Sequence, residues 1–338
     1  MILSKWKQCS LLTILFLVFT GIAEAQPPTA DHHIHIRSED ASESLLRILS
    51  EVQGREEVPI EPSTSASDVI ARLDSSGTRY AALLSTAYFF AMPDLEFRNE
   101  ESRTRSENDY VASQAEQAPD RLVAICAVNP LSEYALREVI RCGESGRFAG
   151  LKLHFANSDV NLRNSSHVDR LRVVFQEASQ QNLAIIVHAW TRNPDFGKVD
   201  VQIFIDELLP LAQGVPVQVA HLGGPGTFSD VTAEAARTFA EAIENDKPAM
   251  ENVYFDIAEV PHHPDRAGND ERRQAMEQAN RELSGLIKRL GTGRVFWGTD
   301  WIAGPVEVYL SMLKPMQSNI IIWKEIHSNK APYFNTLN

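Results

Sequence analysis

Short apolar segments, each of a length typical of a buried strand, recur along the chain and alternate with segments of helical periodicity. The apolar segments lie at residues 31–36, 80–86, 121–128, 149–154, 183–189, 215–221, 252–258 and 294–300. One helix-patterned segment falls in each interval, at residues 65–77, 106–120, 131–143, 165–181, 200–214, 229–245 and 271–291. Ser or Asp often precedes these segments and Gly or Pro often follows, as helix caps do.

Strict strand and helix alternation over eight strands predicts an α/β fold, a single-domain (β/α)8 TIM barrel. A doubly wound open sheet is the alternative, but no glycine-rich nucleotide-binding turn follows any of the predicted strands. We expect the barrel to span residues 26–338.

The connection from Ser38 to Pro62 is longer than the usual loop after a barrel strand. Residues 39–54, EDASESLLRILSEVQG, have the pattern of an extra helix. Insertions after barrel strands lie at the mouth of the active site, so this segment is either a lid or substrate wall or a surface excursion.

Residues 1–25 resemble a secretory signal peptide, with Lys5 and Lys7 before an apolar run and small residues near Ala25. Cleavage near Ala25 would place the protein in the periplasm or outside the cell. An uncleaved anchor is the alternative, although the apolar run is shorter than the roughly 20 residues of a membrane span. After cleavage no membrane association is expected.

Charge and cysteine content limit the classes of partner. Removal of residues 1–25 takes away two lysines and one glutamate and leaves 30 basic against 44 acidic residues, net −14. An acidic chain argues against nucleic acid as a partner and favours a small-molecule substrate. Cys126 and Cys142 could pair in an oxidising compartment, but the sequence does not decide this. A monomer and a homodimer fit the sequence equally well.

Histidines and one aspartate gather at the carboxyl ends of the predicted strands. They are His35 in the first strand, His154 in the fourth, His188 in the fifth, His221 in the sixth and Asp300 in the eighth. These ends meet at one face of a barrel, where catalytic groups collect. Nitrogen donors with one carboxylate suit Zn²⁺ or a similar divalent cation, so the pattern predicts a metal site.

Strand alternation predicts which side chains share a face. His33 and His35 should point together toward the site, whereas His32 should point away, toward the helices. Lys152 shares a face with His154 within an apolar strand. A buried lysine needs a partner or a lowered pKa.

In order along the chain, these motifs resemble the amidohydrolase superfamily, and more closely its amidohydrolase-related branch. DHHIHI resembles the first-strand D-x-H-x-H motif, VHA and AHLGG resemble the histidine motifs of strands five and six, and VFWGTDW resembles the eighth-strand G-[ST]-D motif. QAPDRLVAICAVNP, GLKLHF, NVYFDIA and IHSNKAPYF are further similarities.

The resemblance implies a ligand set and a reaction. His33, His35, His188 and Asp300 would be the core metal ligands, and His221 would be either a ligand of a second metal or a free imidazole. In binuclear relatives a carboxylated fourth-strand lysine bridges two cations, here Lys152. The other possibility is one cation, with Lys152 remaining an amine that pairs with a carboxylate.

A metal-dependent hydrolase follows as the leading hypothesis, acting on an amide, lactone or ester. Asp300 would act as general base and then acid, with His221 or the metal polarising the carbonyl. A one-metal non-oxidative decarboxylase or hydratase of a small carboxylic acid is the alternative. A non-catalytic periplasmic protein that binds metal or ligand is a third hypothesis.

Substrate contacts are expected from loops at the same rim. Trp190 and Trp301 could wall an organic group, and Arg192 or Arg266 could bind an anionic one. His154 could reach the cavity or form a structural hydrogen bond.

Overall fold

A computed structural model describes the protein at residues 26–52, 54, 60–319 and 322–337. The proposed signal peptide lies outside the described residues. Eight strands form the inner layer: β1 (Ala30–His35), β2 (Tyr80–Leu84), β3 (Leu122–Ala127), β4 (Gly150–His154), β5 (Ala184–His188), β6 (Val217–Val219), β7 (Val253–Asp256) and β8 (Val295–Phe296). The eight predicted strands are therefore confirmed, β6 and β8 being shorter than expected.

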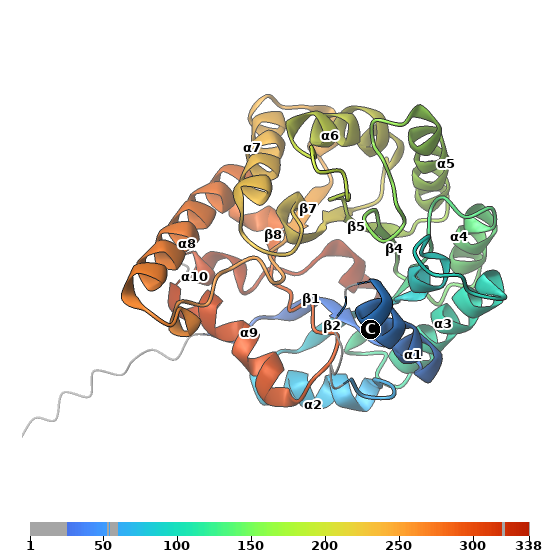
Figure 1. Cartoon of the computed structure of the whole chain (residues 1–338), viewed down its shortest axis with the longest axis horizontal. Coiled ribbons are helices and arrows are strands. Elements are labelled where there is room, and N and C mark those ends of the chain that lie inside the picture. Colours follow the sequence, from blue (N-terminus) through green and yellow to red (C-terminus); the bar gives the residue numbers. More distant parts are fainter. Residues whose placement is uncertain (1–25, 53, 55–59, 320–321, 338) are drawn as a thin grey trace, which may run out of the picture.

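The helices surround the strands as an outer ring (Figure 1). They are α1 (Glu39–Arg47), α2 (Ala66–Ser76), α3 (Glu100–Ala115), α4 (Ala135–Glu144), α5 (Ser165–Gln180), α6 (Lys198–Ile203), α7 (Asp230–Glu244), α8 (Asp270–Leu290), α9 (Val306–Asn319) and α10 (Trp323–Ile326). In the described part of the chain, no helix has both the length and the apolar character needed to cross a membrane.

Local sequence signals explain where these helices begin and end, as α2 illustrates. Its N-cap Ser65 accepts a hydrogen bond from the backbone N–H of Asp68, and the Asp68 carboxylate accepts one from the backbone N–H of Ser65. The helix ends at Gly77, whose φ of 73° is the left-handed conformation that glycine adopts without strain.

All strands are parallel and lie in sequence order, from β1 to β8. The barrel closes where the chain after β8 runs beside β1. Ile34 and Trp301 form a parallel bridge, the backbone N–H of His32 donates to the Trp297 carbonyl, and that of Asp300 donates to the His33 carbonyl. These contacts confirm the predicted (β/α)8 TIM barrel.

A β-bulge in β1 places one histidine differently from the prediction. Asp31 pairs with Ala81 and Ile34 with Leu83. Two residues of β1, His32 and His33, therefore lie opposite a single residue of β2, Ala82. The predicted outward direction of His32 is therefore wrong. Its ring stacks on Phe296 inside the barrel, with centroids 4.5 Å apart. Strict alternation failed here because a bulge lets two successive side chains share a face.

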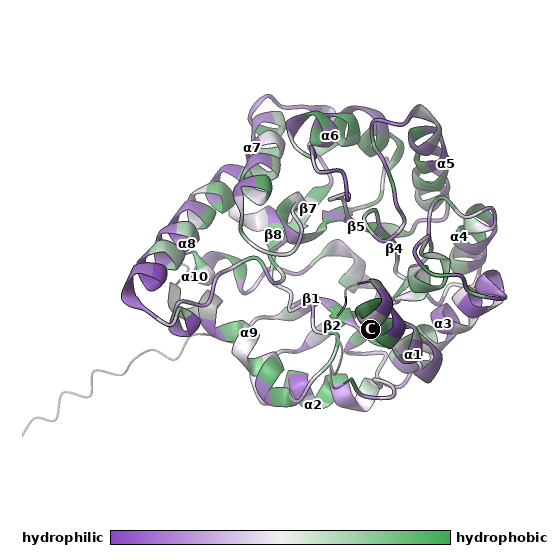
Figure 2. Cartoon of the chain, viewed as in Figure 1, coloured by the Kyte–Doolittle hydropathy of each residue, from purple (hydrophilic) through white to green (hydrophobic). Residues whose placement is uncertain are grey.

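The barrel interior below the site is filled by small and aromatic side chains. The C-terminal segment closes this end: Tyr333 and Phe334 pack against the ring of His32, and the Tyr333 hydroxyl donates to Gln218. Between the strands and the helices lies the larger core, and Figure 2 shows helices that carry hydrophobic and hydrophilic residues while the strands are mostly hydrophobic. The filled interior makes the opposite end the open one.

The long connection after β1 forms α1 and a π-helical segment, η1 (Ile48–Val52). The N-cap Ser38 accepts from the backbone N–H of Ala41, and Arg103 of α3 pairs with Asp40. The extra helix is thus confirmed, and it is fixed to the barrel at its start. A disulfide joins Cys126 of β3 to Cys142 of α4, which answers the question of pairing that the sequence left open.

Candidate metal centre

The carboxyl ends of the strands bring the predicted ligands together. The Nε2 atoms of His33 and His35 lie 3.2 Å apart, and the Asp300 Oδ1 atom lies 3.2 Å from the first and 3.3 Å from the second. The His221 Nε2 atom lies 3.9 Å from the other oxygen of Asp300. Two nitrogens from β1, one from the segment after β6 and a carboxylate thus face a common point.

Hydrogen bonds at the far side of each ring fix the tautomers. The Nδ1 atom of His33 lies 3.0 Å from the Asp256 carboxylate, that of His35 lies 3.3 Å from the Leu84 carbonyl, and that of His221 lies 2.7 Å from the Ala258 carbonyl. Because those oxygens only accept, each Nδ1 carries the proton. Each Nε2 atom therefore presents a lone pair to the common point, as metal-ligating histidines do.

His188 supplies a further nitrogen donor. It is the last residue of β5, it is buried, and its Nε2 atom has no hydrogen-bond partner among the described residues. Its ring lies against that of His221, with centroids 5.0 Å apart, and stacks on His154 at 4.1 Å. A buried polar atom without a partner usually indicates a missing ligand, and a cation fits this donor set.

Burial favours the uncharged form of four imidazoles, those of His33, His35, His154 and His188. It lowers the pKa of His33 to about 4, with the nearby Lys152 as a second cause, and lowers the pKa of His35, His154 and His188 as well. Neutral imidazole is the form that binds a metal ion. Burial alone would raise the pKa of Asp300, but the His33, His35 and His221 rings hold it below its usual value.

Lys152 lies within the same cluster. Its Nζ atom is 3.1 Å from the His33 Nε2 atom and donates to that lone pair. The side chain is 1% exposed, and burial lowers its pKa to about 8. An amine in this state is a better nucleophile toward carbon dioxide than an ordinary lysine, so both the amine and the carbamate fit the site.

Asp256 was not among the predicted site residues, although it ends β7 and faces the cluster. Its carboxylate accepts from His33, from the Gln218 amide at 2.7 Å and from the backbone N–H groups of His221 and Ala258 at 3.0 and 3.2 Å. Burial would raise its pKa, but His33 and His221 lower it overall. The position at a strand end was the sequence signal that could have identified it.

Backbone conformation is unusual at this rim. His221, Leu222, Glu259 and Asp300 have positive φ values between 54° and 56°, which non-glycine residues seldom adopt. Such strain collects at functional sites. At Gly298 a Cβ atom would lie 2.8 Å from the His33 Cβ atom, so only glycine lets the chain after β8 approach β1 here.

A cavity of about 420 Å³ opens over the cluster. It is lined by all the predicted ligands, namely His33, His35, Lys152, His188, His221 and Asp300, and by His154. The structure does not bring Trp190, Arg192, Trp301 or Arg266 to this lining. Trp301 is buried against Arg72, 4.0 Å away, and Arg192 pairs with Asp94.

A sequence profile of the amidohydrolase family matches residues 70–317, about three quarters of the chain. The chain belongs to the amidohydrolase family. The comparison with curated protein sequences gives no match.

Solved structures with the same fold include hydrolases and decarboxylases. A protein described as a 2-pyrone-4,6-dicarboxylic acid hydrolase from Pseudomonas putida has 16% identity and a TM-score of 0.56, with 92% of this chain and 98% of that chain covered. The 5-carboxyvanillate decarboxylase of Sphingomonas paucimobilis has 15% identity and a TM-score of 0.62, covering 92% and 99%. The corresponding enzyme of Novosphingobium aromaticivorans, with bound manganese, has 12% identity and a TM-score of 0.57, covering 93% and 97%.

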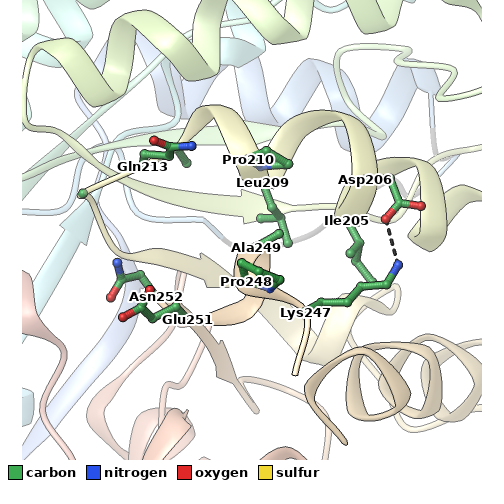
Figure 3. Close-up of a pocket in the computed structure, with 12 residues that line it drawn as sticks. Ile205, Asp206, Leu209, Pro210, Gln213, Lys247, Pro248, Ala249, Glu251 and Asn252 are labelled. Carbon is green, nitrogen blue, oxygen red and sulfur yellow. Dashed lines mark hydrogen bonds and ion pairs between the residues drawn. The ribbon is translucent and has the colours of Figure 1, made fainter. Parts of the chain in front are cut away.

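This amidohydrolase has a second hollow, of about 500 Å³, in the loops before β6 and β7 (Figure 3). It lies at the opposite end of the barrel, where an ion pair of 2.8 Å joins Lys247 to Asp206. Its described lining contains no histidine or cysteine. The amino-terminal face of a barrel usually serves stability, so the candidate centre is the one at the carboxyl ends.

Proposed function

We propose that the protein is a metal-dependent hydrolase that cleaves an ester, lactone or amide bond of a small organic substrate. The observation that carries the proposal is the convergence of lone-pair nitrogens from His33, His35 and His221 on the Asp300 carboxylate at the floor of the cavity, with the unpartnered His188 Nε2 atom in the same lining. His33, His35, His188 and Asp300 would hold a divalent cation, and zinc is the ion we propose.

A bound divalent cation supplies Lewis acidity, which lowers the pKa of water and polarises a carbonyl group. Asp300 is 29% exposed toward the cavity, so one of its oxygens can accept a proton from the attacking water. Water then adds to the acyl carbon, the bond to the leaving oxygen or nitrogen breaks, and Asp300 returns the proton to the leaving group. His221 donates its Nδ1–H to the Ala258 carbonyl, so its Nε2 lone pair, 3.9 Å from Asp300, can accept a hydrogen bond from the attacking water and orient it.

Decarboxylation of a small carboxylic acid is the second candidate, and Lys152 is the observation that favours it. As an amine beside His33, Lys152 would bind a substrate carboxylate at the reacting position. Similar structures of decarboxylases, one with manganese, support this candidate at the level of fold. As a carbamate, Lys152 would instead bridge two cations and favour hydrolysis.

Two measurements on the mature protein separate the candidates. Protein reloaded with zinc or manganese in bicarbonate is assayed on a panel of lactones, esters and amides by proton release, and on aromatic carboxylic acids by release of carbon dioxide. Hydrolysis with about two metals per chain supports the carbamate form. Carbon dioxide release with one metal per chain supports the decarboxylase. Retention of metal with no turnover in either panel would leave only a binding role.

We also propose that the protein is exported to the periplasm or beyond. The Cys126–Cys142 disulfide supports this, since such bonds persist in oxidising compartments. Fractionation of the native host with an antibody against the chain tests the proposal; recovery with the cytosol would overturn it.

A further inference from the structure

The outer part of the cavity is walled by apolar side chains. Leu45 of α1 and Ile48 and Leu49 of η1 line it and are 7%, 3% and 9% exposed. Phe89 and Ile302 line it from the loops after β2 and β8. The long connection after β1, which forms α1 and η1, therefore lines the cavity with apolar side chains.

Among the residues that the structure describes, the lining of that wall carries no positive charge. The lining residues include no arginine, and their one lysine is Lys152, which lies at the floor beside His33. Described arginines near the wall point elsewhere. Arg47 pairs with Glu51, and Arg192 pairs with Asp94. Arg37 donates to the Ser42 hydroxyl and the Ile302 carbonyl; it is fully buried and does not line the cavity, although its Nη2 atom has no partner among the described residues. A carboxylate on the body of a substrate would thus be buried without a cation, which costs several kcal/mol.

Two polar side chains, Tyr88 and Asn157, interrupt the apolar lining, and Tyr88 lies beside the apolar wall residue Phe89. Tyr88 lines the cavity and is 2% exposed, and its ring lies 5.1 Å from that of His154. Its hydroxyl forms no hydrogen bond with any described residue. Burial, with Asp300 as a second cause, raises the pKa of Tyr88, so the hydroxyl keeps its proton. A buried O–H group without a partner is available to a substrate oxygen.

We propose, building on the function proposed above, that the substrate is a small uncharged ester, lactone or amide with an aryl or alkyl body. The body packs against Leu45, Ile48 and Leu49, and the Tyr88 hydroxyl donates to an oxygen of the substrate. The apolar wall excludes relatives that carry a carboxylate on the body. Leu49 and Tyr88 are accordingly specificity-determining residues.

The first test uses a matched pair of substrates. Dihydrocoumarin is an uncharged aromatic lactone, and its ring-carboxylated form differs by one anionic substituent. We expect kcat/KM of the metal-loaded enzyme to be at least about 100-fold higher for the uncharged lactone. Equal rates, or a preference for the carboxylated lactone, would overturn the proposal.

Variants with a matched control locate the selectivity. Leu49→Arg places a cation in the wall. It should reduce the ratio of kcat/KM for the uncharged lactone to kcat/KM for the carboxylated lactone at least about 10-fold. Leu46→Arg lies on the exposed face of α1, where Leu46 is 43% exposed, and should leave the preference unchanged. Tyr88→Phe should lower kcat/KM about 10-fold. If the folded Leu49→Arg and Leu46→Arg proteins had equal ratios of kcat/KM for the two lactones, Leu49 would not be part of the wall that selects the substrate.

A binding measurement separates this inference from the proposed function. The lactam 3,4-dihydro-2-quinolinone resembles dihydrocoumarin and resists hydrolysis, so calorimetry with the wild-type protein measures cavity preference without turnover. Tighter binding of the lactam than of its ring-carboxylated form supports the proposal, even where dihydrocoumarin is not cleaved and hydrolysis fails. Equal or weaker binding of the uncharged lactam, or no binding at millimolar concentration, overturns it.

Discussion

The Nε2 atoms of His33 and His35 lie 3.2 Å apart, and both carry lone pairs, because their Nδ1–H groups donate to the Asp256 carboxylate and the Leu84 carbonyl. Two lone pairs that face each other repel unless an electron-poor group lies between or beside them. The Asp300 carboxylate at 3.2 and 3.3 Å adds negative charge to the same point. The Lys152 Nζ atom, 3.1 Å from the His33 Nε2 atom, answers one of these lone pairs, and the His188 Nε2 atom has no partner among the described residues. The remaining lone pairs and the carboxylate are arranged for a cation.

Removal of one of these imidazoles should remove the metal. We expect His35→Asn to weaken zinc affinity more than about 100-fold, since loss of a direct ligand exceeds the effect of losing an outer partner. Metal per chain after reloading and dialysis measures this. His167→Asn, on the surface-facing start of α5, is the control and should bind metal like the wild type. Unchanged metal content in His35→Asn would contradict the ligand assignment.

Asp256 should act through His33. Asp256→Asn removes the charge that holds the Nδ1 proton of His33, so we expect metal affinity to fall about 10- to 100-fold with the fold retained. Competition with a chelator of known affinity gives the value, and circular dichroism confirms folding. Asp246→Asn, an exposed position, is the matched control. If Asp256→Asn lowered only the stability of the fold and left the metal affinity of the folded protein unchanged, the role of Asp256 would be purely structural.

His32 should make the metal-free protein sensitive to acid. Burial lowers its pKa to about 4, against about 6.5 in an unfolded chain. The folded state thus binds fewer protons, and the stabilising contribution is complete above pH 6.5 and is lost as the pH falls toward 4. The difference amounts to about 3 kcal/mol in the free energy of unfolding.

The His32→Gln variant isolates this effect. Glutamine can still donate to the Trp297 carbonyl and does not titrate, so its free energy of unfolding should fall less between pH 7 and pH 4. Asp31, whose pKa burial raises to about 7, changes stability in the opposite direction but is present in both proteins. The free energy of unfolding is measured by urea denaturation at each pH. An equal decrease from pH 7 to pH 4 in the wild-type and His32→Gln proteins would refute the prediction.

The disulfide should contribute to stability in oxidising conditions. It closes a chain separation of 16 residues between Cys126 and Cys142, for which loop entropy gives about 3 kcal/mol. We expect the double variant Cys126→Ala and Cys142→Ala to melt at lower temperature than the oxidised wild type. Reduction with dithiothreitol should lower the melting temperature of the wild type alone. Equal melting temperatures would indicate that the bond adds nothing.

The sequence predicted the barrel because strands and helices each leave their own periodicity of apolar residues in the local sequence. The order of these segments along the chain is also their order around the barrel. The sequence also predicted that His35, His154, His188, His221 and Asp300 would meet, since parallel strands bring their carboxyl ends to one face, and all five line the cavity. The long segment after the first strand was correctly placed at the mouth of the site, and the structure makes it a wall of the cavity.

Features that depend on contacts between distant parts of the chain could not be predicted from the sequence. The bulge that turns His32 inward follows from the pairing of β1 with β2, and no local pattern encodes it. Asp256 stands at a strand end, but its role depends on the His33 ring, 223 residues away in the chain. The rim tryptophan Trp301 was expected at the substrate, but the bridge from Ile34 to Trp301 and its contact with Arg72 place it in the core.

Metal content per chain tests the central claim most directly. Protein purified without chelator, and the same protein reloaded with zinc or manganese in bicarbonate, would be measured by inductively coupled plasma mass spectrometry. The account predicts one or two divalent cations per wild-type chain and fewer than about 0.1 in the His33→Asn and His35→Asn double variant. A folded wild-type protein that holds no metal after reloading would contradict it.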